Sequence, residues 1–276
     1  MLEKSKLNSQ LQIAVPKEKR LSGVFNELAA YGNLRVVQDN PRVDSGVLVD
    51  TYEPYDPSLG QGLDDYLKRT QMSDVEVVYE KQSDMFNSLE FFGTDAAIMG
   101  SDKMLERQLA DPNRSLAPKF KVTARFKDAF GMNPARLAIC GETVIQSPQE
   151  LNGQRIATSY PNVLEAWLAD NKIEGALPIP KGSSVEDMIR RGAADYICDV
   201  VQSGDTLKAY GYTPLFDVAR VYPVLVESMV RPVKQDMIDL RNRLKLAQKP
   251  MGGLPKLADM AYTCLLYTSP SPRDRG

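Results

Sequence analysis

The chain has 276 residues, of which 43% are hydrophobic and 25% charged, so it is long enough for two compact lobes and has the composition of a globular protein. Its 34 Lys and Arg residues nearly balance its 36 Asp and Glu residues, which excludes a strong overall attraction to nucleic acid or to an anionic membrane. The absence of histidine excludes Ser-His-Asp and Cys-His triads, histidine bases and histidine metal ligands.

Short apolar runs alternate with amphipathic helical patterns along the chain. Strands are predicted at residues 11–15, 75–79, 95–99, 136–140, 154–158, 176–179, 194–201 and 221–226. Helices are predicted at residues 21–31, 85–92, 102–110, 163–171, 185–191 and 234–246. This alternation predicts an α/β protein with mixed, mostly parallel sheets and helices on both faces.

Two segments do not follow this alternation. Residues 38–72 are rich in Pro, Gly and acidic side chains, which predicts a long surface loop with a short helix near residues 63–69. Residues 264–276 have no periodicity and resemble translated adapter sequence rather than a native terminus.

The cysteines and the apolar runs bear on location. Cys140, Cys198 and Cys264 are odd in number and widely spaced, which argues against a disulfide framework or a zinc site. The first apolar run is too short for a signal peptide, and no run reaches the roughly 18 residues of a membrane span. We therefore expect a cytoplasmic protein without nucleic acid or membrane partners.

The most informative motif is at residues 195–207, DYICDVVQSGDTL. A strand ends in a turn with two hydroxyls, Ser203 and Thr206, and Gly204 allows close approach of a phosphate. Asp199 near the strand end could accept hydrogen bonds from ribose hydroxyls. The alternative is an ordinary strand, turn and helix with Ser203 as the helix N-cap.

Other strand ends carry weaker signals. Residues 151–162 bring Arg155 and a hydroxyl cluster to a helix start, with a simple capped helix as the alternative. Three cations at residues 17–20 suit a diphosphate at the carboxyl end of the first strand, but such a run is more often a solvated face. The Gly100 turn and Arg136 are further candidates, with a helix cap and a surface strand residue as the alternatives.

The order of these motifs resembles the ATP phosphoribosyltransferase family. The match is close through residues 151–215, where RIATSYP is followed by a helix, SVE and the 195–207 motif. Residues 95–100 and 17–22 resemble further family motifs, and the resemblance covers about residues 10–37 and 73–245. It implies two α/β lobes like those of type II periplasmic binding proteins, with the active site in the cleft. The lobes would comprise residues 1–118 with 219–247, and residues 119–218, followed by an irregular tail at 248–276.

The resemblance also implies roles for individual residues. Asp199 would hold the ribose hydroxyls, and Arg20 would approach the diphosphate as the second catalytic residue. Substrate-binding roles are expected for Lys17, Gly100, Arg136, Arg155, Ser159, Tyr160, Glu186, Asp195, Ser203, Gly204, Asp205 and Thr206. Two positions depart from the family: Lys19 replaces a glycine, and Asp205 places a carboxylate where a small residue is usual.

The implied reaction joins ATP to phosphoribosyl diphosphate in the first step of histidine biosynthesis, with release of diphosphate. Mg²⁺ would arrive with the diphosphate rather than in a site built by the protein. The resemblance implies a homo-oligomer and allows a regulatory subunit. Two alternatives remain open at this point: a two-lobed small-molecule binding protein without catalysis, and an inactive regulatory relative.

Overall fold

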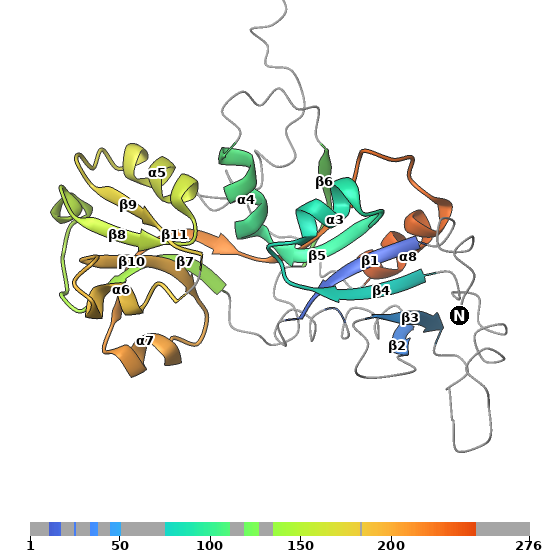
Figure 1. Ribbon diagram of the computed structural model, residues 1–276, viewed down its shortest axis with the longest axis horizontal. Coiled ribbons are helices and arrows are strands. Elements are labelled where there is room, and N and C mark those ends of the chain that lie inside the picture. The colour runs from blue at the N-terminus through green and yellow to red at the C-terminus, as the bar shows by residue number, and fades with distance from the viewer. Residues whose placement is uncertain are drawn as a thin grey trace, which may run out of the picture. The chain divides into compact units, whose positions relative to one another are not determined.

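The computed structural model describes residues 11–17, 25, 34–37, 45–50, 75–110, 119–126, 135–182 and 184–246. The chain divides into two compact units, each with its own sheet (Figure 1). Unit 1 comprises Met1–Met99, Ala117–Phe130 and Pro223–Met251, and unit 2 comprises Gly100–Leu116, Gly131–Tyr222 and Gly252–Gly276. The predicted tail from residue 248 lies outside the described residues.

These boundaries differ from the lobes expected from the sequence in the region between residues 100 and 130. Strand β6 (Phe120–Arg125) belongs to unit 1 because it pairs antiparallel with β12 (Pro223–Ser228). Helix α4 (Ser101–Leu109) belongs to unit 2 because it packs against α5 (Pro161–Asp170). The division expected at residue 118 instead puts β6 in the second lobe and α4 in the first.

Unit 1 is built on a seven-stranded sheet in the order β2-β3-β4-β1-β5-β12-β6. The remaining elements of this unit are β1 (Leu11–Pro16), β2 (Leu34–Val37), β3 (Ser45–Asp50), β4 (Val75–Glu80), β5 (Ala96–Gly100), α3 (Met85–Phe91) and α8 (Gln235–Leu246). Strand β1 pairs parallel with β4 and β5, while β2, β3 and β6 pair antiparallel. The apolar side chains of β1 and β5 are fully buried, as expected for strands covered on both faces.

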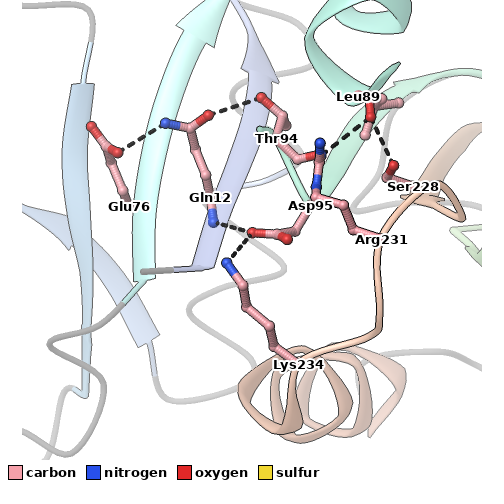
Figure 2. Close-up of polar contacts among 8 residues, drawn as sticks. All are labelled: Gln12, Glu76, Leu89, Thr94, Asp95, Ser228, Arg231 and Lys234. Carbon is pink, nitrogen blue, oxygen red and sulfur yellow. Dashed lines mark hydrogen bonds and ion pairs between the residues drawn. The ribbon is translucent and has the colours of Figure 1, made fainter. Parts of the chain in front are cut away.

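A polar network at the amino end of β5 connects the start of α8 to the sheet of unit 1 (Figure 2). The Asp95 carboxylate accepts hydrogen bonds from the backbone N–H of Gln12 and from Nζ of Lys234, both at 2.9 Å. The Arg231 guanidinium donates to the carbonyls of Leu89 and Thr94, and so holds the segment after β12 against the end of α3. Asp95 belongs to a segment that resembles a family motif. Its carboxylate is bonded to Gln12 and Lys234, other residues of the same unit, at the amino end of β5.

Unit 2 is built on a five-stranded sheet in the order β11-β7-β10-β8-β9. Its strands are β7 (Ala135–Gly141), β8 (Arg155–Thr158), β9 (Leu177–Pro180), β10 (Tyr196–Val201) and β11 (Thr213–Val221). Its remaining helices are a 3-10 turn, η3 (Pro148–Leu151), and helices α6 (Asp187–Arg190) and α7 (Asp205–Tyr210).

Two apolar cores cover the two faces of the unit 2 sheet. Trp167 and Leu164 of α5 pack against Ile139 and Cys198 on one face. Leu207 of α7 belongs to the core on the other face. Helices therefore cover both faces, as the sequence predicts, and Pro161 occupies the first turn of α5.

Four strands were not predicted. Strand β3 lies within residues 38–72, so the prediction of a surface loop is wrong at residues 45–50; β3 pairs antiparallel with β4. Strands β2, β6 and β11 were also missed, and the predicted strand at 221–226 is two strands separated at Tyr222. Each sheet is mixed, as expected, with a parallel block flanked by antiparallel strands. The predicted helix at 21–31 lies outside the described residues except for Phe25, which is helical and buried.

Candidate functional site

The carboxyl ends of the parallel strands in unit 2 form one edge of the sheet, called here the carboxyl edge. Strands β8, β9 and β10 end there at Thr158, Pro180 and Val201. Strand β7 runs antiparallel and begins at the same edge, with Arg136 opposite Val201. Open α/β sheets bind ligands at the carboxyl ends of their parallel strands, so this edge is the candidate site of unit 2.

The first turn of α4 is fixed to the same edge. The backbone N–H of Ser101 donates to the Tyr222 carbonyl at 2.8 Å, and the N–H of Tyr222 donates to Oγ of Ser101 at 3.0 Å. Tyr222 directly follows β11, which ends at the carboxyl edge because Val221 pairs with Ala135. Asp102 and Lys103, the next residues of α4, are therefore brought to the site from a distant part of the sequence.

The turn after β8 is held by internal hydrogen bonds. Oγ1 of Thr158 donates to the Cys198 carbonyl at 2.8 Å and accepts from the Tyr160 N–H at 2.9 Å. The Ser159 hydroxyl donates to the Lys181 carbonyl at 2.8 Å. The Tyr160 hydroxyl donates to the buried Asp102 carboxylate at 2.6 Å. These bonds fix the Tyr160 ring at the carboxyl edge.

Gly100 leaves room for Asp102. A Cβ atom at position 100 would lie 2.0 Å from Oδ1 of Asp102, which is far inside van der Waals contact. Any other residue would displace the carboxylate that holds Tyr160. The structure thus gives Gly100 a packing role at the site, in addition to the ligand contact expected from the sequence.

Glu106 fills the amino end of α5. Its Oε1 accepts from the backbone N–H of Asn162 at 3.1 Å and from its Nδ2 at 2.6 Å, while its Oε2 accepts from the Val163 N–H at 3.0 Å. A helix amino end attracts anions because its first N–H groups lack partners within the helix. Here a carboxylate of the protein satisfies them, so the 151–162 motif does not offer this helix end to a phosphate.

The turn at residues 202–206 is more open. Gly204 has φ of 75°, a left-handed conformation that favours glycine, and α7 begins at the next residue. Ser203 and Thr206 are exposed, and Oγ of Ser203 accepts from the Asp205 N–H at 3.3 Å. The Asp205 side chain is 79% exposed and lies 4.0 Å from Nζ of Lys208. Its carboxylate is thus directed toward solvent and Lys208, which reduces the expected repulsion of a phosphate at this turn.

Asp199 is the half-buried carboxylate of the site. Burial raises the pKa of Asp199 from its ordinary value of 3.8 to about 6, and the charges of Glu186 and Asp102 act in the same direction. The Val200 N–H, which donates to Oδ1 of Asp199 at 2.8 Å, and the Lys103 ammonium lower this pKa. Asp199 is therefore ionised at neutral pH, close to a protonation step, and able to accept hydrogen bonds.

Two predicted substrate residues lie at the opposite edge of the sheet and bind each other. The Arg155 guanidinium donates to Oδ1 and Oδ2 of Asp195 at 2.7 and 3.1 Å and to the Gly192 carbonyl at 2.9 Å. These bonds hold the pKa of Asp195 below its usual range. Arg155 begins β8 and Asp195 precedes β10, so this geometry assigns both to a structural pair rather than to the carboxyl edge.

The remaining predicted residues are distributed over both units. Arg136 lies at the carboxyl edge with Nε 2.7 Å from Oδ1 of Asp217, an ion pair without hydrogen-bond alignment. Lys17 lies in unit 1, where its backbone N–H donates to the Glu80 carbonyl at 2.9 Å. Arg20 and Lys19 lie outside the described residues.

Sequence reasoning missed Asp102, Lys103 and Glu106. All three lie on the first two turns of α4, directly after the Gly100 turn, which was a candidate site with a helix cap as the alternative. The spacing of Asp102 and Glu106 by four residues does place both carboxylates on one helix face. Their partners, Tyr160 and Asn162, are more than 50 residues away in the sequence, so no local pattern reveals the contact.

Other kinds of site would need a cluster of metal ligands, an activated thiol or a membrane-spanning helix in the described part of the chain. Among these residues, no group of three or more Cys, Asp or Glu side chains is arranged to hold a metal ion. Cys140 and Cys198 are buried and free, and burial raises the pKa of both thiols, so neither resembles an activated nucleophile. No helix in the described ranges has the length and apolar character needed to span a membrane.

Known proteins resemble this chain in sequence and in fold. It is 33% identical over 138 residues to an ATP phosphoribosyltransferase of Stenotrophomonas maltophilia. The aligned region covers 50% of this chain and 45% of that protein. It is 30% identical over 173 residues to the enzyme of Rhodopirellula baltica, covering 62% of this chain and 53% of that protein. The chain thus spans about half the length of the curated relatives it matches.

A solved structure extends the likeness in fold. It is the ATP phosphoribosyl transferase (HisG:HisZ) complex from Thermotoga maritima, with a TM-score of 0.58, 18% identity and coverage of 86% of this chain and 97% of that one. The family model of HisG, ATP phosphoribosyltransferase, matches residues 81–246, which is more than half of the chain and includes every element of the carboxyl edge. On this evidence the chain belongs to the ATP phosphoribosyltransferase family.

Proposed function

We propose that the protein transfers the phosphoribosyl group of phosphoribosyl diphosphate to ring nitrogen 1 of ATP, with release of diphosphate. The observation that carries this proposal is the position of Asp199 beside the open 202–206 turn at the carboxyl edge of unit 2. A carboxylate that accepts hydrogen bonds suits the two ribose hydroxyls, and a turn with exposed hydroxyls and a left-handed glycine suits the 5-phosphate.

The reaction makes modest chemical demands. The adenine nitrogen is neutral and carries a lone pair, so the nucleophile needs no strong base, and a chain without histidine can support the displacement. The protein's contribution is to position two polyanions and to stabilise the charge that develops on the leaving diphosphate. Mg²⁺ enters as part of the substrate, bound to the diphosphate with much of its water.

The residues proposed to bind substrate follow from their positions. At the carboxyl edge of unit 2 these are Arg136, Ser159, Tyr160, Glu186, Asp199, Ser203, Gly204, Asp205 and Thr206. Gly100 acts through Asp102. In unit 1, Lys17 follows β1, and Arg20 is proposed from the resemblance alone as the residue that approaches the diphosphate.

The Thermotoga maritima structure is a complex of two kinds of subunit, HisG and HisZ. By likeness of fold, we propose that this chain also functions in an oligomer, with a further regulatory subunit as its partner. The test is the mass of the purified protein in solution, alone and with a candidate regulatory subunit. A protein that stays monomeric in both samples would contradict this part of the proposal.

The activity is tested by mixing the protein with ATP, phosphoribosyl diphosphate and Mg²⁺, with inorganic diphosphatase present to draw the equilibrium forward. Product formation is followed by ultraviolet absorbance. We expect turnover that is lost in Asp199→Ala and retained in Asp170→Ala, which changes an exposed carboxylate at the end of α5. Absence of turnover in the unsubstituted protein, or equal turnover in both variants, would contradict the proposed function or the assigned site.

A further inference from the structure

Lys103 is a cation at the carboxyl edge that the sequence motifs do not include. It lies in the first turn of α4, two residues after Ser101, whose hydrogen bonds with Tyr222 fix the start of this helix to unit 2. Its Nζ contacts the Tyr160 ring, and Tyr160 is linked by hydrogen bonds through Thr158 to the carbonyl of Cys198, the chain neighbour of Asp199. The charge of Lys103 also lowers the pKa of Asp199. Lys103 is half-buried, which limits the positions its side chain can adopt.

The ammonium is held without being neutralised. Its Nζ lies 4.1 Å from the centroid of the Tyr160 ring, a cation–π contact. This ring is itself buried, and its hydroxyl is bonded to Asp102. Within the described ranges, Lys103 forms no ion pair. An aromatic ring leaves the formal charge and most of the N–H donors of an ammonium available, whereas a carboxylate partner would largely cancel the charge.

The surroundings of Lys103 indicate why a cation is needed there. The carboxylates of Glu186 and Asp102 both act to raise the pKa of Asp199, so this part of the edge carries a surplus of negative charge. These negative charges suit ribose hydroxyls but oppose an anionic substrate. An ammonium held on the Tyr160 ring supplies a local attraction for a phosphate, which the net charge of the chain, -2, does not supply.

We propose that Lys103 is a substrate-binding residue that recognises the diphosphate group next to the ribose, with Tyr160 as the platform that positions its ammonium. This proposal rests on the proposed function for the identity of the substrate. The ligand class is a phosphate or diphosphate monoester adjacent to a sugar. Lys103 contributes charge and hydrogen-bond donors, and Tyr160 contributes orientation through its ring.

The test compares Lys103→Gln, Lys103→Arg and Arg107→Gln, the last being an exposed cation one turn further along the same helix. Loss of a charged hydrogen bond should raise KM for phosphoribosyl diphosphate about 10- to 100-fold in Lys103→Gln, with kcat and KM for ATP changed less than about threefold. Lys103→Arg should recover most of the affinity, and Arg107→Gln should match the unsubstituted protein. A KM unchanged in Lys103→Gln would overturn the proposal.

A second comparison tests the platform. Tyr160→Leu removes the ring and should raise the same KM, but in the Lys103→Gln background it should add little, because ring and ammonium act as one unit. Fully additive effects of the two substitutions would exclude the platform role.

Direct binding separates this proposal from the proposed function. The dissociation constants of phosphoribosyl diphosphate and of inorganic diphosphate with Mg²⁺ are measured by calorimetry for the same variants. If the unsubstituted protein binds but shows no turnover, the proposed function fails, and a weaker binding in Lys103→Gln still supports the Lys103 site. If the unsubstituted protein and Lys103→Gln bind equally well, the proposed role of Lys103 is rejected and the proposed function is not. If the unsubstituted protein does not bind either ligand, both proposals are rejected.

Discussion

Replacing Asp199 with asparagine should stabilise unit 2 while removing activity. The pKa of Asp199 is raised in the folded protein to about 6, so its ionised form is less favourable there than in the unfolded chain. Asparagine has nearly the same shape and carries no charge, and its amide oxygen can still accept the hydrogen bond from the Val200 N–H. The substitution therefore removes an electrostatic cost and keeps the local backbone contact.

The size and the pH dependence of this effect follow from the two pKa values. A raised carboxyl pKa means that the folded state holds the proton more tightly, so stability falls as pH rises from about 4 to about 6 and then stays level. A pKa difference of about 2 corresponds to about 3 kcal/mol above pH 7, and to roughly half of that at pH 5. Since a half-buried amide also needs partners, we expect Asp199→Asn to gain about 1–3 kcal/mol at pH 8.

The fluorescence of Trp167 makes this measurement specific to unit 2. It is the only tryptophan of the chain, and it is buried in the core between α5 and the unit 2 sheet. Urea unfolding of both proteins at pH 8 and pH 5 should give a higher midpoint for Asp199→Asn, by a margin that shrinks at pH 5. A destabilised variant, or a margin independent of pH, would refute the argument that burial and neighbouring carboxylates oppose the Asp199 charge.

Four further predictions concern other residues. The value of kcat/KM for phosphoribosyl diphosphate should fall about tenfold per pH unit below about pH 6, since only ionised Asp199 accepts both ribose hydroxyls, and a flat profile to pH 5 would contradict this role. Glu106→Ala leaves the first N–H groups of α5 without their acceptor and should lower the unfolding free energy by about 1–3 kcal/mol, whereas Glu165→Ala at an exposed position of the same helix should change it by less than about 0.5 kcal/mol, both followed by Trp167 fluorescence. Gly100→Ala should displace the Asp102 carboxylate and lower both the thermal midpoint and the turnover, and it should cost less in the Asp102→Ala background; equal costs in the two backgrounds would exclude the packing role of Gly100. Asp195→Asn should lower the melting temperature at pH 7, by a difference that decreases as pH falls through the lowered pKa of Asp195, and should leave KM unchanged; a raised KM would restore the substrate role expected from the sequence.

The secondary structure could be predicted where an apolar run was compact and bounded. Strands β1, β4, β5 and β7 were located within one or two residues because buried strands give continuous apolar runs. Strand β3 was missed because its surroundings are rich in Pro, Gly and acidic residues, a composition typical of loops. It becomes a strand through pairing with β4, which the local sequence does not encode.

The site could be predicted in part from motifs. Asp199 and the 202–206 turn were identified as candidates because a strand, a hydroxyl-bearing turn and a helix follow each other in the sequence. The raised pKa of Asp199 could not be predicted, because it depends first on burial in the folded unit and then on the charges of Glu186 and Asp102. The exposure of the Asp205 side chain likewise follows from its place on the folded helix α7.

The two turns at the ends of β8 and β10 show most clearly where sequence reasoning stops. Both consist of a strand, a hydroxyl-bearing turn and a helix start, and both were candidate anion sites for the same physical reason. In the structure, the helix end after the first turn is filled by Glu106 of α4, and the second turn remains open. Because α4 enters unit 2 from a segment more than 50 residues earlier, the difference is a property of the tertiary fold. The same helix also carries Lys103, so one element both satisfies the helix end after β8 and places a cation on the Tyr160 ring, where its charge lowers the pKa of Asp199.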